Sequence, residues 1–190
     1  TSKTEIRKKE AVYLAFPFAG SDPTYRLGMS NIIQRPDKDF AKGACHEWYC
    51  VQDFVSLADT TNSIEIVWTS PDVPLVCLSE LNRGRWIATP ELTTSTIFSY
   101  AMNNYWHTNY KAGQGGDFHF EYSFTSGRPG ISNEQCIQFA RDTAKPLIAA
   151  VSSGSAAPAK AAGLSVEGEG VVVTTVAGAQ EGEGTIVRLR

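Results

Sequence analysis

Short apolar runs separated by polar turns follow one another along this chain, and most of them have the two-residue period of a β-strand. Residues 11–16 (A-V-Y-L-A-F) are followed by Pro17, which has no N–H for a ladder and is predicted to end that strand. Residues 48–57 and 63–68 flank the polar turn 59–62. Strands joined by a short polar turn pair readily, so these two are predicted to form an antiparallel hairpin.

Four more stretches have strand patterns. Residues 29–33 are interpreted as a strand with long flanking loops. Residues 118–124 (F-H-F-E-Y-S-F) alternate strictly, so their four aromatic side chains are predicted to share one face, which is typical of core packing. Near the end of the chain, residues 170–176 and 184–190 are predicted to be two strands joined by a polar, glycine-containing turn.

One segment has a helical pattern instead. Ser132 is followed three residues later by Gln135, which is a capping-box signature, and apolar residues at helical spacing follow until Pro146. A short helix is therefore predicted over residues 132–145. Many strands, frequent turns and one helix together predict a mainly β protein, an antiparallel β-sandwich.

The same pattern divides the chain into four parts. Residues 1–9 are polar and are expected to be a flexible lead-in, and residues 10–150 are expected to form the β-sandwich core with its short helix. The small-residue segment 151–163 is predicted to be a mobile loop, and residues 164–190 a terminal β-hairpin that completes or continues the sandwich. Because the chain begins at Thr1 and ends within a predicted strand, we expect it to be a piece of a longer protein.

Composition and charge narrow the classes of function. With 190 residues and 42% hydrophobic residues, the chain can bury a core. A net charge of −3 without a basic cluster argues against a nucleic-acid partner, and the absence of a long apolar run argues against a membrane partner. The four cysteines are too scattered for a disulfide scaffold or a zinc site. They are predicted to be small buried side chains, and a cytoplasmic location is expected.

Residues 100–110 (Y-A-M-N-N-Y-W-H-T-N-Y) interleave aromatic rings with amide and hydroxyl groups. A sugar-binding surface needs this combination, because rings stack on C–H faces while amides bond to hydroxyls. A buried polar–aromatic strand whose amides satisfy neighbouring loops would use the same residues. Both interpretations remain open at the level of sequence.

Motifs of catalysis are missing from the sequence. There is no G-x-S-x-G nucleophile motif and no phosphate-binding loop, and the acidic residues cannot be paired from sequence into the two carboxylates of a glycosidase. A mutarotase-like enzyme would need a convergent histidine and carboxylate, for which His107, His119 and Glu121 are the candidates. No catalytic or metal-binding residue is predicted.

Five blocks of the chain together resemble the C-terminal β region of glycoside hydrolase family 38, the α-mannosidases. They are residues 10–18, 48–57, 70–75, 103–110 and 172–189. The blocks occur in the order found in the family and span nearly the whole chain, and the N-N-Y-W-H-T-N block is fairly specific. The resemblance implies a sandwich of the galactose-mutarotase-like supersandwich type.

In that family the aspartate nucleophile and the zinc ligands belong to an upstream catalytic domain. The resemblance therefore implies a non-catalytic fragment of a retaining α-mannosidase-like hydrolase, inactive alone and without a cofactor of its own, whose partner is the zinc-dependent catalytic domain of the same polypeptide. It also implies that one face of the sandwich abuts that domain and lines its mannoside site. The candidate substrate-binding residues are Trp106, His107, Thr108, Asn109, Asn103 and Asn104. Two alternatives remain: these residues only seal the interdomain contact, or the chain is an autonomous carbohydrate-binding module.

Overall fold

The structure, a computed structural model, consists of two compact units, Thr1–Pro146 and Leu147–Arg190. The residues that it describes are 1–82, 85–104, 113–146, 149, 151, 164–168 and 171–189. Among these residues the chain is mainly β, every strand pairing is antiparallel, and there is one short helix. The predicted fold class is therefore confirmed, with a layout like that of a sandwich.

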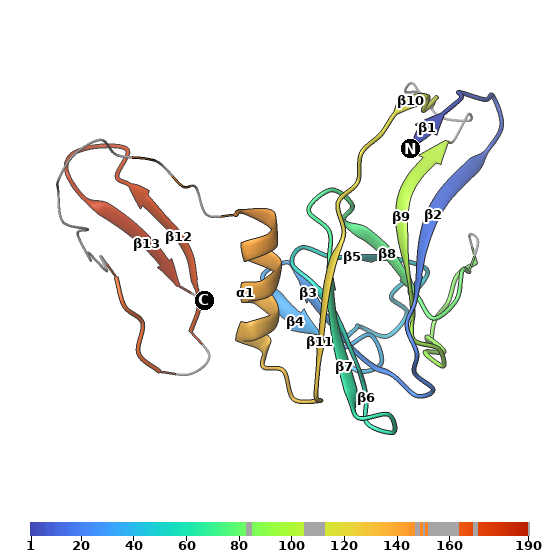
Figure 1. The fold of residues 1–190 in the computed structure, drawn as a ribbon, viewed down its shortest axis with the longest axis horizontal. Coiled ribbons are helices and arrows are strands. Elements are labelled where there is room, and N and C mark those ends of the chain that lie inside the picture. Colours follow the sequence, from blue (N-terminus) through green and yellow to red (C-terminus); the bar gives the residue numbers. More distant parts are fainter. Residues whose placement is uncertain are drawn as a thin grey trace. The chain divides into compact units, whose positions relative to one another are not determined.

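The first unit contains two main sheets (Figure 1). The four-stranded sheet has the order β2 (Glu10–Pro17), β9 (Thr96–Asn104), β8 (Leu75–Leu78) and β5 (Tyr49–Cys50). The five-stranded sheet has the order β11 (Ser123–Gly127), β7 (Ile64–Thr69), β6 (Val55–Asp59), β3 (Thr24–Met29) and β4 (Ile32–Gln34). A separate short pair joins β1 (Ser2–Lys3) to β10 (Gly116–Asp117).

Alternate side chains of both sheets form one hydrophobic core between them. The buried cluster consists of Tyr25, Leu27, Tyr49, Val51, Val55, Leu57, Ile66, Trp68, Val76, Leu78 and Ile97. Apart from Val51, which follows β5, these residues come from β3, β6 and β7 on one side and from β5, β8 and β9 on the other. Because successive side chains of a strand point to opposite faces, each sheet also has an outer face that this core does not use.

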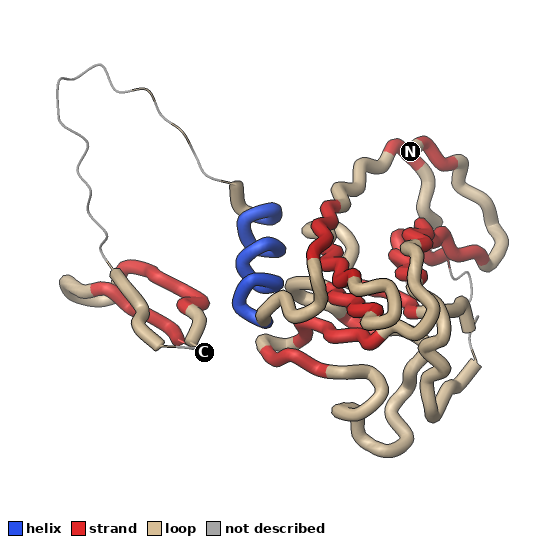
Figure 2. The backbone as a smooth tube through the Cα atoms, turned by 60° about the horizontal axis from the view of Figure 1, so that its bottom comes forward, coloured by secondary structure: helices blue, strands red, loops and turns tan. Residues whose placement is uncertain are grey.

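The helix α1 (Asn133–Ala144) begins with the predicted capping box. Ser132 Oγ accepts a hydrogen bond from the Gln135 N–H at 3.2 Å, and Gln135 Oε1 accepts one from the Ser132 N–H at 2.9 Å. Its buried residues, Cys136, Ile137 and Ala140, face the five-stranded sheet, where α1 contacts β7. In Figure 2 the helix lies along one side of the strands of this unit.

Replacing Ser132 by Ala is expected to lower the free energy of unfolding by about 1 kcal/mol, because the first turn loses its side-chain acceptor. Urea unfolding followed by circular dichroism measures the change. Ser126→Ala is the matched control, since Ser126 is exposed and lies outside the helix, and it should stay within about 0.5 kcal/mol of the wild type. Equal losses in both variants would contradict the capping role.

The single strand predicted over residues 48–57 is wrong, because the structure has two strands there that lie in different sheets. β5 belongs to the four-stranded sheet and β6 to the five-stranded sheet. Between them, the N–H groups of Gln52 and Asp53 donate to the carbonyl oxygen of Gly28 at 2.7 and 3.1 Å. The apolar pattern hides this crossing because both strands contribute side chains to the same core. The predicted hairpin is confirmed for the second strand, since β6 pairs with β7.

The strand with long flanking loops predicted over residues 29–33 is also wrong, because a tight hairpin joins β3 to β4 at this place. Its two turn residues, Ser30 and Asn31, have φ angles of 47° and 61°, as the central residues of a type I′ turn do. The side chains of Gln52 and Asn31 hydrogen-bond at 3.0 Å, and the Asn31 N–H donates to Gln52 Oε1 at 3.0 Å. These contacts from a distant loop help to hold the turn.

The alternating segment 118–124 is not a continuous strand. Only its last residues belong to β11, and the Glu121 backbone is instead held by side chains of the loop 70–72, at 2.6 and 2.8 Å. Tyr122 packs on the core cluster, whereas Phe124 is 59% exposed, so the predicted common core face is wrong. Residues 118–122 connect β10 to β11, which is the edge strand of the five-stranded sheet. In the described structure these five residues pair with no strand.

The polar N-terminal segment, expected to be a flexible lead-in, is tied to the sandwich at several points. The Thr1 ammonium donates to the Phe118 carbonyl and the Phe118 N–H donates to the Thr1 carbonyl, both at 2.7 Å. The Asn104 amide donates to the carbonyl oxygens of Ile6 and Lys8 at 2.8 and 3.0 Å. The segment therefore contains β1 and satisfies a buried side chain of β9.

The second unit contains a hairpin of β12 (Val173–Gly178) and β13 (Thr185–Leu189), which confirms the predicted pair of terminal strands. Several of its apolar side chains are exposed by 37–59%: Val176, Ile186, Val187 and Leu189. Of the segment 151–163, predicted to be a mobile loop, residues 152–163 lie outside the described residues.

Candidate functional site

The structure describes two of the six candidate substrate-binding residues. The other four, Trp106, His107, Thr108 and Asn109, lie outside the described residues. Asn104, at the end of β9, is fully buried and its amide bonds to the N-terminal segment, which gives it a structural role. Asn103 is half-buried and lines a shallow pocket together with Asp72, Tyr100 and Gln114.

Aromatic side chains occupy the outer face of the four-stranded sheet. Tyr13 and Tyr100 are paired across β2 and β9, and their rings stack with centroids 4.5 Å apart. Trp48, which is 39% exposed, lies 6.2 Å from Tyr100. Ile97 of β9 points into the core, so the alternating positions Phe98 and Tyr100 point away from it. We call these four residues, Tyr13, Trp48, Phe98 and Tyr100, the aromatic face.

The Tyr13 hydroxyl of this face and the neighbouring Cys77 thiol are protonated at neutral pH. Burial raises the pKa of Tyr13 to about 12, and it raises the pKa of the neighbouring Cys77 thiol to about 12. Cys77 and Cys136 are buried, as predicted, but Cys50 is exposed, so the prediction of buried cysteines is wrong for that residue. The aromatic face therefore presents rings and a hydroxyl, and the charge of the nearby Glu47 carboxylate contributes to both pKa shifts.

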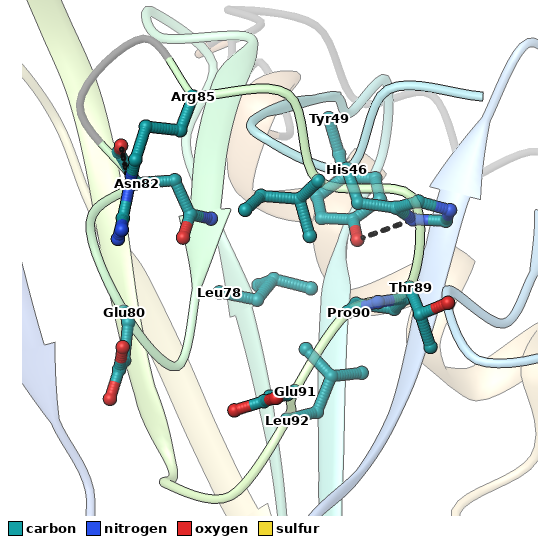
Figure 3. A pocket seen from close by; sticks show the side chains of 11 residues that line it. His46, Tyr49, Leu78, Glu80, Asn82, Arg85, Thr89, Pro90, Glu91 and Leu92 are labelled. Atoms are coloured by element: carbon teal, nitrogen blue, oxygen red, sulfur yellow. Dashed lines mark hydrogen bonds between the residues drawn. The ribbon is translucent and has the colours of Figure 1, made fainter. Parts of the chain in front are cut away.

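A second feature is a cavity of about 260 Å³ formed where the loop between β8 and β9 folds back over β5 (Figure 3). We call it the 80–92 pocket. Its apolar and aromatic lining comes from Tyr49, Leu78, Ile87, Pro90 and Leu92. Its polar lining comes from His46, Glu80, Asn82, Arg85, Thr89 and Glu91. Tyr49, Leu78 and His46 are buried, whereas both glutamates and Arg85 are exposed, so the charges lie at the rim.

The buried part of the pocket is electrically neutral. The His46 Nδ1 atom and the Tyr49 hydroxyl are 3.0 Å apart and hydrogen-bonded. Burial raises the pKa of Tyr49 well above its usual range and lowers the pKa of His46 below its ordinary value. At neutral pH the hydrogen bond therefore joins an uncharged imidazole and a protonated phenol, and both groups can offer hydrogen bonds without a charge.

Sequence analysis did not identify this pocket. A pocket made by a loop folding over a distant strand has no characteristic residue spacing. Tertiary contacts shape the loop: the His46 N–H donates to the Ile87 carbonyl at 3.1 Å. The Arg85 N–H and Nε–H both donate to the Asn82 carbonyl at 3.3 Å. One feature of the sequence could have indicated a binding site here: Glu80, Asn82, Arg85 and Glu91 place four planar polar side chains in one loop.

The residues suggested for a mutarotase-like site do not form a cleft among the described residues. His119 Nε2 lies 3.3 Å from Glu121 Oε1, but these side chains are 84% and 66% exposed. His107 lies outside the described residues. A buried site would shield the acid and the base from water, and this exposed pair is not shielded.

Among the residues that the structure describes, no three His, Cys, Asp or Glu side chains converge in a way that could hold a metal ion. In the same residues, no helix combines the length and the apolar character needed to span a membrane.

Comparisons of the chain with models of protein families, with curated proteins and with solved structures find no match. Function is therefore inferred from the aromatic face, the 80–92 pocket and the sequence blocks.

Proposed function

We propose that this chain is a non-catalytic β-sandwich domain of an α-mannosidase-like retaining glycoside hydrolase. It packs against the zinc-dependent catalytic domain of the same polypeptide and lines part of its sugar site. The sequence blocks that resemble the C-terminal region of glycoside hydrolase family 38 support this proposal. The structural observation that carries it is the difference between the outer faces of the two sheets.

The outer face of the five-stranded sheet is covered. Arg26, Ser56 and Glu65 form a buried polar cluster there, which is bonded to residues 130 and 131 and lies beneath α1. The four-stranded sheet has no helix over its outer face in the described part of the chain (Figure 1). It carries the aromatic face instead, in which Tyr100 is buried and Trp48 is 39% exposed. Surfaces rich in aromatic side chains are typical of contacts between domains and proteins.

The position of the aromatic face connects the interface to the sugar site. Tyr100 belongs to this face, and Asn103 follows it three residues later on the same strand. A domain docked on the aromatic face would therefore lie next to Asn103, the first residue of the block 103–109. In the proposed complex this block provides ring faces and amides that orient a pyranose, and the zinc of the catalytic domain supplies the Lewis acid.

The hairpin of the second unit also fits a larger assembly. A two-stranded hairpin is marginally stable alone in water, and this one exposes Val176, Ile186, Val187 and Leu189. Exposed apolar side chains on such a hairpin are consistent with a domain that packs within a larger enzyme. The proposed location is the cytoplasm, where the four unpaired thiols stay reduced.

The second candidate function is an autonomous carbohydrate-binding module. The shallow pocket at Asn103 favours it, because Tyr100, Asn103 and Gln114 place a ring and two amides beside one another at the surface. A module would bind sugar as the isolated chain. A supporting domain would acquire its sugar contacts only in the full polypeptide.

Hydrolysis of an aryl α-mannoside tests the proposed function. With zinc present, the full polypeptide that includes this chain is expected to turn over the substrate, and the isolated chain is expected to be inactive. Trp48→Ala in the full polypeptide should lower kcat/KM by about tenfold or more. Loss of this contact would shift the β-sandwich domain, and the substrate that it helps to position would be misplaced. Phe124→Ala is the matched control, since Phe124 is an exposed aromatic residue outside the aromatic face, and it should leave kcat/KM unchanged.

Two outcomes would overturn the proposal. The first is turnover by the isolated chain, which would place a catalytic site within these 190 residues. The second is a full polypeptide that binds zinc but does not hydrolyse α-mannosides. An equal effect of Trp48→Ala and Phe124→Ala would contradict the assignment of the aromatic face as the contact surface.

A further inference from the structure

The 80–92 pocket lies at the opposite end of β9 from the start of the candidate sugar-binding block 103–109. Nine strand residues span about 27 Å at ~3.4 Å per residue, so the two ends of β9 are well separated. We propose that the 80–92 pocket is a second, independent binding site that takes one pyranose ring of a carbohydrate. This inference does not depend on the identity of the catalytic domain.

The size and lining of the pocket suit a single sugar ring. Ligand pockets range from roughly 300 to 1,000 Å³, and this cavity of about 260 Å³ is just below that range, which favours one ring over an extended chain. Tyr49, Leu78 and Leu92 provide apolar surface for the C–H face of a pyranose. In Figure 3 the Tyr49 hydroxyl points into the pocket above Leu78, where it can bond to a ring substituent.

The rim offers the donors and acceptors that neighbouring hydroxyl groups require. Each sugar hydroxyl both donates and accepts, so a matching site needs both kinds of partner. Glu80 and Glu91 accept, Arg85 donates, and Asn82 does both. The planar carboxylates, guanidinium and amide can each bond to two adjacent hydroxyls at once, as Arg and carboxylates do in bidentate pairs.

The charges of the rim exclude phosphate as the preferred ligand. Two carboxylates stand against one guanidinium, and the buried histidine is neutral, so an anion would meet net repulsion. A neutral polyol meets no such repulsion, and it can bond to the donors and the acceptors of the rim. The chemistry of the rim therefore favours an uncharged sugar over a phosphorylated one.

Trp86 supplies both a contact and a reporter. It lies between the lining residues Arg85 and Ile87, and it is 66% exposed. An exposed indole beside a polar pocket can stack on a second sugar residue that extends out of the site. Its fluorescence should respond when a sugar enters the pocket.

Titration of the 190-residue chain with mannose, galactose and glucose tests the inference, with tryptophan fluorescence and amide NMR shifts as readouts. At least one sugar is expected to bind saturably, with a Kd on the order of 1 mM, and to shift amides of the loop 85–92. Arg85→Ala and Glu91→Ala should each weaken binding at least tenfold. Both residues are exposed, so unfolding midpoints should stay close to the wild type.

The matched controls are Arg128→Ala and Glu121→Ala, which remove the same side chains from exposed positions outside the pocket. They should bind sugar as the wild type does, and Trp106→Ala should as well. The inference is overturned if none of the three sugars binds saturably. It is also overturned if Trp106→Ala abolishes binding while Arg85→Ala does not, or if inorganic phosphate binds more tightly than the sugars. None of these results affects the hydrolysis assay of the full polypeptide, so the two proposals fail separately.

Discussion

Replacing Glu65 by Ala is expected to lower the free energy of unfolding by about 3–5 kcal/mol, because it leaves a largely buried charge without its partner. Glu65 is 2% exposed and lies between the five-stranded sheet and α1. Its carboxylate accepts hydrogen bonds from Ser56 Oγ at 2.7 Å and from the N–H groups of Gly130 and Ile131 at 2.8 and 3.0 Å. It also pairs with the Arg26 guanidinium at 2.5 Å. Urea unfolding of the isolated chain measures the loss.

Glu65→Gln is the control that keeps the shape but removes the charge, and it should lose less stability than Glu65→Ala. Burial by itself would raise the pKa of Glu65, but the hydrogen bonds and Arg26 outweigh it, and the pKa lies below its ordinary value. The stabilisation by the carboxylate is therefore complete above the unfolded pKa of about 4.3, and it is lost as pH falls through the lower folded pKa. Acid should thus narrow the difference between wild type and Glu65→Gln. A constant difference from pH 7 to pH 2 would contradict this account.

Replacing Trp68 by Ala is expected to destabilise the chain by about 3–5 kcal/mol, because it empties the centre of the sandwich. Trp68 is 1% exposed and belongs to β7. Its ring lies 5.5 Å from Phe16 of β2 and 5.7 Å from Tyr122, so it connects the two sheets. Circular dichroism is the suitable readout for urea unfolding, since the substitution also removes a fluorophore.

Trp48→Ala is the matched control for this prediction. It makes the same chemical change at a residue that is 39% exposed on the aromatic face, so the isolated chain should lose about 1 kcal/mol or less. Trp68→Phe should be milder than Trp68→Ala, because it keeps a ring and removes a buried indole N–H that has no hydrogen-bond partner among the described residues. Equal losses from Trp68→Ala and Trp48→Ala would contradict a core between the two sheets.

The described part of the stretch 100–110 shows which features of the candidate site could be predicted from the sequence. The mixture of rings and amides allowed either a sugar surface or a buried strand. Tyr100 stacks on Tyr13, and the Asn104 amide bonds to carbonyl oxygens of the N-terminal segment, as a buried polar–aromatic strand requires. Asn103 remains accessible beside them. Sequence could not separate these roles, because adjacent strand residues face different neighbours that lie far away along the chain.

The sequence by itself determined the elements whose information is local. The capping box at Ser132 placed the start of α1, Pro17 marked the end of β2, and polar turns placed the hairpins β6–β7 and β12–β13. Each depends on hydrogen bonds or alternation within one segment or between two neighbouring ones, so a short window of residues is sufficient to predict it.

Only the tertiary structure decided which sheet each strand joins and which polar groups meet. β5 and β6 read as one strand, yet they lie in different sheets, because the hydrophobic effect that buries them has no direction. The partner of Arg26 is Glu65 on another strand, and the 80–92 pocket requires its loop to fold back over His46 and Tyr49. These contacts join residues that are distant in sequence, and they form only when the two sheets pack together.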